Sequence, residues 1–357
     1  MAEQTRPSAL VDLRSDTVTK PTPEMRDAMR DAEVGDDVMG EDPTVQQLEA
    51  MAAERMGMEA GLFVASGTMA NQVCVCTHTR RGQEMIIEEN AHILHFEAGT
   101  IAAFAGVQPK PLPSVRGAMD PADVEGAIRP DNEHFPRTGL ITVENTHNME
   151  GGAAVPKENM AAVIDVGRRR GIPVHIDGAR IFNAAIALGV SPGELVAGAS
   201  SVAFCFSKGL GCPIGSVITG SREFIAEARR VRKMFGGGMR QAGVIAAPAI
   251  VALESMVDRL GQDHEHARIL AQALAELPGV TLDPAEVQTN IIIFEFERDD
   301  VDAQQLVAAM RERGVLINPR PRIQPREAQR IRVVTHNDVS REDIDRAVAA
   351  FRDVLAL

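Results

Sequence analysis

The chain has 357 residues, of which 45% are hydrophobic and 24% are charged, as is typical of a folded protein with a large core. Its formal net charge of −13 makes nucleic acid and anionic membranes poor partners, although a local basic patch remains compatible with a small anionic ligand. The four cysteines have neither zinc-site nor disulfide-framework spacing, and no apolar stretch is long enough to span a bilayer. We therefore expect a reduced, cytoplasmic protein without a membrane span.

Helix signals dominate the start of the chain. Residues 11–19 are too polar for a buried strand and are expected to form an extended arm. Residues 22–31 and 42–57 each begin with a capping side chain followed by a proline, which suits the first turn of a helix, and the second segment ends at a glycine. Both segments are predicted to be helices.

A strand, a turn of small residues and a helix follow between Leu62 and Gly82. At the turn, Ser66, Gly67 and Thr68 would present free backbone N–H groups and a hydroxyl at the helix start, the arrangement with which helix N-termini bind phosphate. An ordinary strand-to-helix turn with a serine cap explains the same residues. The turn alone does not decide between the two.

Strands and helices then alternate as far as residue 206. Strands are predicted at 85–88, 139–144, 172–177 and 202–206, and helices at 91–99, from 120 and at 160–170. Such alternation is typical of an α/β fold with a mostly parallel sheet covered by helices, whose ligands bind beyond the carboxyl ends of the strands. Chemically capable side chains lie at or just after these ends: Thr68, His92, Glu144, Asp177 and Lys208.

The pattern changes near residue 258. A long helix, a strand at 289–296, a helix at 302–314, strands near 315 and at 330–334 and a last helix from 340 follow, and two of these helices open with residues that resemble capping boxes. We expect residues 1–257 to form an arm and a large domain, and residues 258–357 to form a smaller α+β domain.

Lys208 follows a short, fully apolar strand and precedes glycines and a proline that exclude a helix. Burial beside such a strand favours the neutral amine, which is the nucleophile that forms a Schiff base with a carbonyl. A lysine that reaches from a strand edge into solvent is the alternative.

Asp177 ends its strand 31 residues before Lys208. A carboxylate aimed at a heteroaromatic nitrogen keeps that nitrogen protonated, as pyridoxal phosphate requires to act as an electron sink. An aspartate that caps the following helix is the alternative. A phosphate turn, a carboxylate and a strand-end lysine in this order are together best explained by a pyridoxal phosphate site.

These motifs resemble those of the low-specificity L-threonine aldolase family of fold-type I pyridoxal phosphate enzymes, and the resemblance extends over nearly the whole chain. The family fold is a large domain with a mostly parallel sheet covered by helices, plus a smaller C-terminal α+β domain. The segments that carry the resemblance are residues 12–22, 40–44, 66–71, 144–148, 175–184, 207–211, 236–243 and 333–336.

The resemblance implies that Lys208 forms the Schiff base with pyridoxal 5'-phosphate, that Asp177 pairs with the ring nitrogen and that His92 stacks on the ring. It assigns the phosphate to Gly67 and Thr68, assisted by Arg240 of the same chain or of a neighbouring subunit, and it also places Arg180 in the cofactor site.

The substrate site implied by the resemblance binds a β-hydroxy-α-amino acid. Its carboxylate would contact Ser15, Arg180 and Arg332, because a guanidinium fork matches a carboxylate. His92 and His134 are the candidates to contact the β-hydroxyl and assist its deprotonation, since histidine titrates near neutrality. His147 is expected to be structural.

The implied reaction is retro-aldol cleavage of L-threonine, L-allo-threonine or phenylserine to glycine and an aldehyde. Another fold-type I reaction, such as β-elimination or transamination, is the first alternative, and a regulatory pyridoxal phosphate-binding protein is the second. The family pattern suggests a homotetramer built from dimers, and no cluster of metal ligands is evident.

Two positions depart from the family pattern, in a chain that contains no tyrosine: Met39 and Phe96 stand where tyrosine is common. The loss of two phenolic hydroxyls leaves open the preference between threonine and allo-threonine and predicts acceptance of a bulkier β-substituent, such as phenyl.

Overall fold

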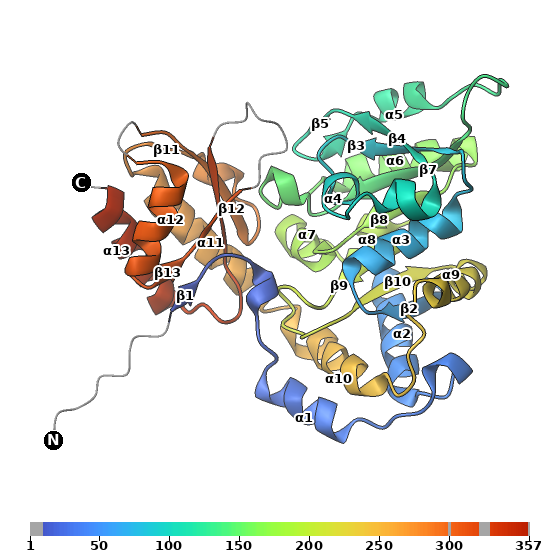
Figure 1. The fold of residues 1–357 in the computed structure, drawn as a ribbon, viewed down its shortest axis with the longest axis horizontal. Coiled ribbons are helices and arrows are strands. Elements are labelled where there is room, and N and C mark those ends of the chain that lie inside the picture. The colour runs from blue at the N-terminus through green and yellow to red at the C-terminus, as the bar shows by residue number, and fades with distance from the viewer. Residues whose placement is uncertain (1–9, 299–300, 321–328, 356–357) are drawn as a thin grey trace.

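A seven-stranded sheet forms the centre of the larger part of the structure (Figure 1). The computed structural model describes residues 10–298, 301–320 and 329–355. The strand order is β2-β10-β9-β8-β7-β3-β4, and every neighbouring pair that does not involve β10 is parallel. The strands are β2 Ala60–Val64, β3 Glu84–Glu88, β4 Gln108–Leu112, β7 Thr138–Glu144, β8 Val174–Asp177, β9 Ser201–Cys205 and β10 Ser216–Gly220.

Helices cover both faces of this sheet because successive strand residues point to opposite sides. Phe63 and Phe204 join one core, whereas their neighbours Leu62 and Ala203 join the core on the other face. The first face is covered by α2 Pro43–Met56, α6 Lys157–Arg170, α7 Ile181–Leu188, α8 Pro192–Val196 and α10 Gly243–Val251, and the second by α3 Gly67–His78 and α9 Arg222–Met234.

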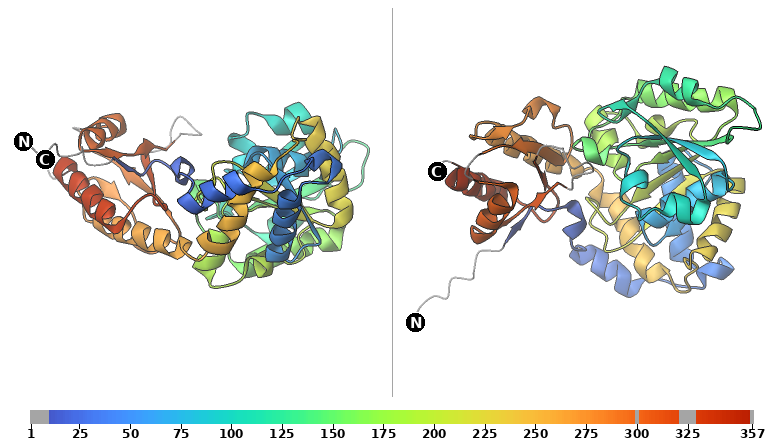
Figure 2. Two further views of the ribbon diagram at one scale, coloured as in Figure 1. Left: turned by 90° about the horizontal axis from the view of Figure 1, so that it is seen from below. Right: turned by 45° about the horizontal axis from the view of Figure 1, so that its top comes forward.

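A separate antiparallel sheet of four strands, in the order β11-β12-β15-β14, forms the C-terminal part (Figure 2). Its strands are β11 Val280–Thr281, β12 Ile291–Phe296, β14 Asn318–Pro319 and β15 Arg330–Val334. Buried side chains from these strands share one core with α11 Leu260–Ala275, α12 Ala303–Glu312 and α13 Arg341–Leu355.

The N-terminal arm connects the two parts. Its strand β1, Val11–Asp12, pairs in parallel with β13, Val315–Leu316, and Val11 and Leu13 are buried in the C-terminal core. The expectation of an arm too polar for a buried strand was therefore wrong for these residues, because the two apolar side chains on one face suffice to anchor it. The chain then passes to α1, Pro23–Asp31, which packs on α10.

The mostly parallel sheet and several helix starts confirm the sequence-based expectations. Thr22 and Asp42 cap α1 and α2 as predicted, and Asp302 forms a capping box with Gln305. Two helix ends were placed too far along the chain: α3 ends at His78, and α4 spans only His92–His95. The second cannot reach residue 99, because residues 98 and 99 both adopt positive φ angles, of 53° and 73°, which a right-handed helix does not allow.

The remaining elements are short. They include α5 Pro121–Ala127, the hairpin formed by β5 Ser114–Val115 and β6 Ala118–Met119, and the short 3-10 or π-helical turns η1 Asp16–Val18, η2 Asp37–Met39, η3 Ile101–Ala105, η4 Asn148–Glu150, η5 Ala252–Met256 and η6 Pro284–Glu286. Within the described ranges, no helix combines the length and apolar character needed to cross a membrane.

Candidate active site at the carboxyl ends of the central strands

A pocket of about 370 Å³ lies beyond the carboxyl ends of β7, β8 and β9. Its lining comes from the N-terminal arm, the central sheet and the C-terminal part, so folding brings together segments that are far apart in the sequence. The predicted site residues that line it are Ser15, His92, Asp177, Arg180, Lys208 and Arg332. Phe96 and Glu144 line it as well.

Asp177 is the last residue of β8 and is almost completely buried. Its Oδ2 accepts a hydrogen bond from Asn71 Nδ2 at 2.9 Å, and its Oδ1 accepts one from the backbone N–H of Ala179 at 3.2 Å. Both contacts are hydrogen-bond donors, so they orient the carboxyl oxygens toward the position that a protonated ring nitrogen would occupy as a partner.

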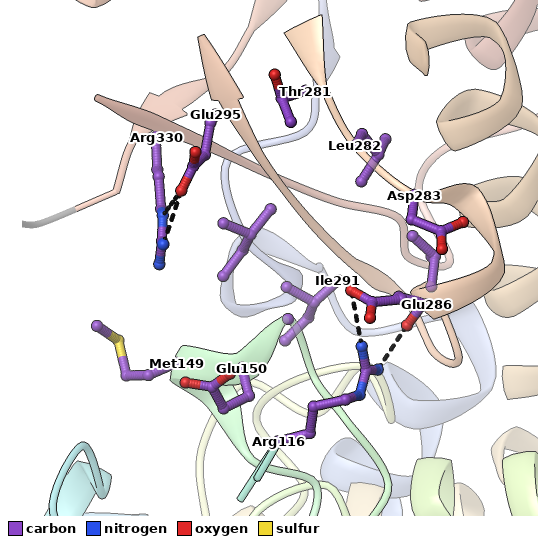
Figure 3. Close-up of a pocket in the computed structure, with 13 residues that line it drawn as sticks. Arg116, Met149, Glu150, Thr281, Leu282, Asp283, Glu286, Ile291, Glu295 and Arg330 are labelled. Carbon is purple, nitrogen blue, oxygen red and sulfur yellow. Dashed lines mark hydrogen bonds and ion pairs between the residues drawn. The ribbon is translucent and has the colours of Figure 1, made fainter. Parts of the chain in front are cut away.

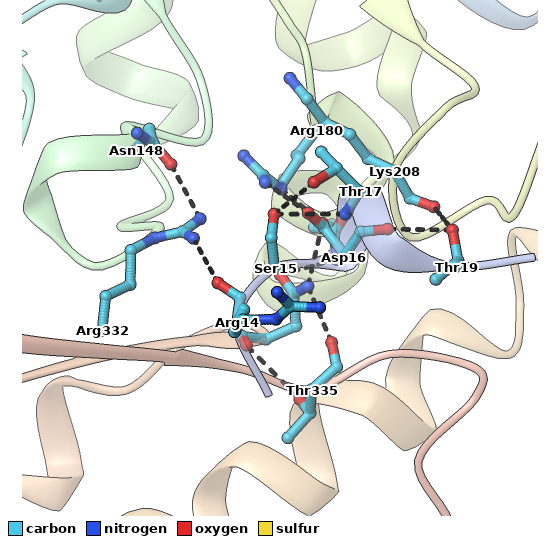
Figure 4. Close-up of polar contacts among 12 residues, drawn as sticks. Arg14, Ser15, Asp16, Thr17, Thr19, Asn148, Arg180, Lys208, Arg332 and Thr335 are labelled. Atoms are coloured by element: carbon cyan, nitrogen blue, oxygen red, sulfur yellow. Dashed lines mark hydrogen bonds and ion pairs between the residues drawn. The ribbon is translucent and has the colours of Figure 1, made fainter. Parts of the chain in front are cut away.

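Lys208 lies three residues beyond the end of β9 and is half-buried. Its backbone is fixed from the arm, since Thr19 Oγ1 donates to the Lys208 carbonyl at 3.0 Å (Figure 4). Gly211 N–H donates to the same carbonyl at 2.8 Å. The loop that carries the lysine is thus held at two points while its side chain lines the pocket.

Arg180 and Asp16 form a buried, bidentate ion pair. Arg180 Nε donates to Asp16 Oδ2 at 2.7 Å and Nη2 donates to Oδ1 at 2.6 Å (Figure 4). Burial opposes ionisation of Asp16, but the Arg180 guanidinium holds the pKa of that carboxyl well below its usual range. The charge of Arg180 is therefore balanced within the protein.

Arg332 is less compensated than Arg180, which faces the same pocket. It donates to the Arg14 carbonyl at 3.3 Å and to Asn148 Oδ1 at 3.2 Å, and its Nε has no hydrogen-bond partner among the described residues (Figure 4). Burial, together with the nearby charge of Arg180, lowers the pKa of Arg332 to about 10. A cation in this state gains from an anionic ligand such as a carboxylate.

The phosphate turn lies at the start of α3. Ser66 caps the helix by accepting from Met69 N–H at 3.2 Å, and no hydrogen bond among the described residues uses the N–H groups of Gly67 or Thr68. A Cβ on Gly67 would lie 2.7 Å from Cys205 Sγ, so only glycine fits there without displacement. The turn is compatible with phosphate binding, although neither Gly67 nor Thr68 belongs to the pocket lining.

Besides Gly67 and Thr68, two further predicted residues lie outside the pocket lining of this chain. The His134 side chain is 79% exposed, and Arg240 forms an ion pair with Asp36 at 2.9 Å on the surface. Their assigned roles stay predictions that require another subunit. Met39 is likewise exposed.

His147 is buried away from the pocket lining and its Nε2 lies 2.8 Å from Glu88 Oε2. Burial disfavours its charged form, but the charges of Glu144 and Glu88 and the hydrogen bond to Glu88 raise the pKa of His147 to about 9. The residue forms a structural ion pair.

Sequence reasoning missed several residues that organise the pocket. Asn71 and Glu97 connect Asp177 to His92 by hydrogen bonds, and Asp16 holds Arg180. Asp16 and Asn71 lie inside segments that carried the family resemblance, and Glu97 follows Phe96, but their partners Arg180 and Asp177 are distant in the sequence. No local pattern indicates such a partner.

A second cleft of about 400 Å³ adjoins the first, and Met149 and Ile293 line both (Figure 3). There, Arg116 forms an ion pair with Glu286 at 3.1 Å. Arg330 of β15 forms a similar pair with Glu295 of β12 at 2.8 Å. No lysine is among the residues that line this cleft, and both of its arginines are paired. The first pocket is therefore the candidate active site.

Comparison with known proteins agrees with this assignment. The family model described as "Beta-eliminating lyase" matches residues 12–297. Low-specificity L-threonine aldolase 1 of Arabidopsis thaliana is 44% identical over 350 residues, which are 97% of this chain and 96% of the relative. The low specificity L-threonine aldolase of Escherichia coli K12 is 42% identical over 348 residues, which are 97% of this chain and 100% of the relative.

A solved structure of threonine aldolase from Leishmania major shares the fold, with a TM-score of 0.82, 18% identity and coverage of 97% of this chain and 99% of that one. Fold and family model together define a fold-type I protein of the β-eliminating lyase class. Within that class, the chain belongs to the family of low-specificity L-threonine aldolases.

Proposed function

We propose that this chain cleaves L-threonine, L-allo-threonine and related β-hydroxy-α-amino acids to glycine and an aldehyde, with pyridoxal 5'-phosphate as its cofactor. The observation that carries the proposal is the meeting of Lys208, Asp177 and Arg332 in one pocket beyond the carboxyl ends of the central strands. The relatives at 42–44% identity, whose names state threonine aldolase activity, support the choice of reaction.

The residues fit the cofactor. Asp177 offers a buried carboxylate, Lys208 an amine in the same pocket, and α3 an N-terminus with two unused backbone N–H groups. We assign the ring nitrogen to Asp177, the aldehyde carbon to Lys208, the ring face to His92 and the phosphate to Gly67 and Thr68. Bound in this way, pyridoxal phosphate supplies an electron sink for the pair released when the Cα–Cβ bond breaks.

The protein's own part in the reaction is orientation and proton transfer. Arg332 and Ser15, with Arg180 held beside them by Asp16, anchor the substrate carboxylate and so fix which bond at Cα faces the cofactor plane. A base takes the proton of the β-hydroxyl as the aldehyde forms, and Cα then gains a proton to give glycine. His92 is the pocket residue suited to the first transfer, and His134 is the second candidate from another subunit.

The family description also names β-elimination, which remains the alternative reaction, together with transamination. These reactions share the lysine, the aspartate and the carboxylate site. They differ in products, because elimination or transamination yields a keto acid, whereas aldol cleavage yields glycine and an aldehyde in equal amounts.

We also propose a homo-oligomer, a tetramer assembled from two dimers, in the cytoplasm. Several large apolar side chains are more than half exposed, among them Met39, Phe104 and Met234, and each gains from burial against another copy. A partner would also bring Arg240 and His134 toward a site that neither residue reaches in its own chain. The four free cysteines suit a reducing compartment. Light scattering on the purified protein measures the mass directly.

The test of the reaction is an aldehyde-release assay with added pyridoxal phosphate, run on L-threonine and L-allo-threonine. Acetaldehyde and glycine are expected together, and Lys208→Ala is expected to abolish both. Lys157→Ala is the matched control, because this half-exposed lysine pairs with Glu194 and is not among the residues that line the pocket. Cofactor binding through Lys208 without aldehyde from either isomer would move the assignment to elimination or transamination.

A further inference from the structure

A buried amide connects two carboxylates at the floor of the pocket. Asn71 Nδ2 donates to Glu97 Oε1 at 2.8 Å and to Asp177 Oδ2 at 2.9 Å, and both acids are at most 3% exposed. The other oxygen of Glu97 accepts from Gln72 Nε2 at 2.6 Å, and His92 Nδ1 lies 3.2 Å from Glu97 Oε1. Glu97 therefore faces N–H donors on both oxygens, as an ionised carboxylate requires.

A chain of hydrogen bonds fixes the orientation of the Asn71 amide. Its Oδ1 can only accept, so His175 Nε2, at 3.2 Å, carries a proton. Burial lowers the pKa of His175 to about 4, so the ring is neutral and its Nδ1 accepts from Ser201 Oγ at 2.9 Å. Ser201 Oγ in turn accepts from His78 Nε2 at 2.8 Å. Every donor in this chain points toward Asn71, which leaves both amide hydrogens for the two carboxylates.

His92 is surrounded by acidic groups from three elements. Glu97 contacts its ring, Asp177 lies beside it at the end of β8, and Glu144 Oε2 accepts from the His92 backbone N–H at 2.6 Å. Lys208, Arg180 and Arg332 are cations that line the same pocket. Burial opposes the charged ring, but the hydrogen bond to Glu97 and the charges of Asp177 and Glu144 raise the pKa of His92 above its usual value.

We propose that Glu97 is a positioning residue for proton transfer: it holds the proton of His92 on Nδ1, so that Nε2 is the nitrogen that takes the β-hydroxyl proton. This inference rests on the proposed function. The proton moves from the hydroxyl oxygen to Nε2 as the aldehyde carbonyl forms, and the imidazolium that results keeps its Nδ1–H on the Glu97 carboxyl group. The same proton is available from Nε2 in the reverse direction.

The positions of Asn71 and Gln72 explain why Glu97 can perform this role next to Asp177. Two buried carboxylates that approach within 4.8 Å repel each other, and one of them would ordinarily bind a proton. The bridging amide of Asn71 offsets that repulsion by donating to both, and Gln72 donates to Glu97 alone. Each acid therefore accepts from an amide donor, and neither has to share a proton with the other.

The test reads the protonation of His92 without turnover. Diethyl pyrocarbonate reacts with a histidine side chain only when the imidazole is neutral. The sample is the full-length chain, stripped of cofactor by hydroxylamine, and peptide mass spectrometry follows modification at His92. The pH dependence of the modification rate gives the midpoint of His92 titration. Glu97→Gln is expected to lower that midpoint by at least one pH unit, so that modification at a pH below it becomes about tenfold faster. The acidic limb of kcat/KM for aldol cleavage should move with it.

Matched measurements separate positioning from general damage. Glu89→Gln makes the same edit at an exposed acid nearby and should leave the profile unchanged, and His95, on the same peptide, is an internal reference. Glu97→Asp retracts the carboxylate by one methylene and should shift the His92 midpoint in the same direction. This variant replaces Glu97→Gln in the test if the glutamine variant does not fold.

The two proposals fail separately. A folded Glu97→Gln or Glu97→Asp variant whose His92 midpoint equals that of the parent overturns the positioning role, even if acetaldehyde forms normally. If the variant shifts the His92 midpoint but the parent protein itself releases no aldehyde, the positioning role is supported and the proposed reaction is refuted.

Discussion

Replacing Asp16 by asparagine tests how much the carboxylate site depends on one buried charge. Asp16 is fully buried and accepts two hydrogen bonds from Arg180 and one from Asn290 Nδ2 at 3.2 Å. The charges of Arg332 and Lys208 also face it. Asparagine keeps the shape but leaves buried cations without their counter-charge, which costs about 3 to 5 kcal/mol of unfolding free energy.

Urea unfolding measures this loss. The chain has no tryptophan or tyrosine, so far-UV circular dichroism is the probe. With a slope of about 3 kcal/mol per molar urea, the midpoint should fall by about 1 M or more. The folded-state pKa of Asp16 is depressed, so its contribution is present above the usual carboxyl pKa and is lost as pH falls below it. Asp16→Asn should therefore lose less stability than the parent on acidification.

Asp31→Asn is the matched control, because Asp31 forms the same bidentate contact with Arg30 at 2.8 and 2.7 Å on the surface. Solvent screens that pair, so its removal should leave the midpoint almost unchanged. Equal midpoints for the two variants would refute the argument that burial, rather than pairing geometry, determines the cost.

Three further outcomes are expected. Gly67→Ala should weaken pyridoxal phosphate binding, measured by absorbance titration, because a Cβ there would lie 2.7 Å from a buried sulfur. The unfolding free energy should decline as pH rises from the usual histidine range through about 9, because His147 has a raised folded pKa and loses its charge beside Glu88. The His147→Gln variant should lack this decline, which the urea midpoint measures. Phe96→Tyr should lower the ratio of phenylserine to threonine turnover, because Phe96 lines the pocket and a hydroxyl there favours a smaller, hydrated substituent.

Each of these outcomes has its own control. Gly126→Ala adds a methyl group where nothing lies within 4 Å, so it should leave cofactor affinity unchanged, and equal loss in both variants would contradict the steric argument. A parent protein equally stable at pH 7 and above pH 9 would exclude a charged, buried His147. If Phe96→Tyr leaves the ratio of phenylserine to threonine turnover unchanged, the ring of Phe96 does not contact the β-substituent of the substrate.

Local signals were enough to predict much of the fold. The caps at Thr22 and Asp42 lie next to the helices they start, so the sequence alone places α1 and α2. Alternating apolar segments likewise predicted the parallel strands, and the position of Lys208 just beyond one of them predicted the chemistry of the site. In each case the determining contacts are between residues near each other in the chain.

Other features were decided only by tertiary structure. The strand Ser216–Gly220 inserts antiparallel between β2 and β9, an insertion that no local pattern had indicated. Arg180 and Asp16 are separated by 164 residues, and Asn71 and Asp177 by 106. A sequence pattern reports which side chains a segment offers, whereas the partner of a buried charge depends on how distant segments pack. Residue types and strand ends follow from the sequence, and the network that sets their charges follows from the fold.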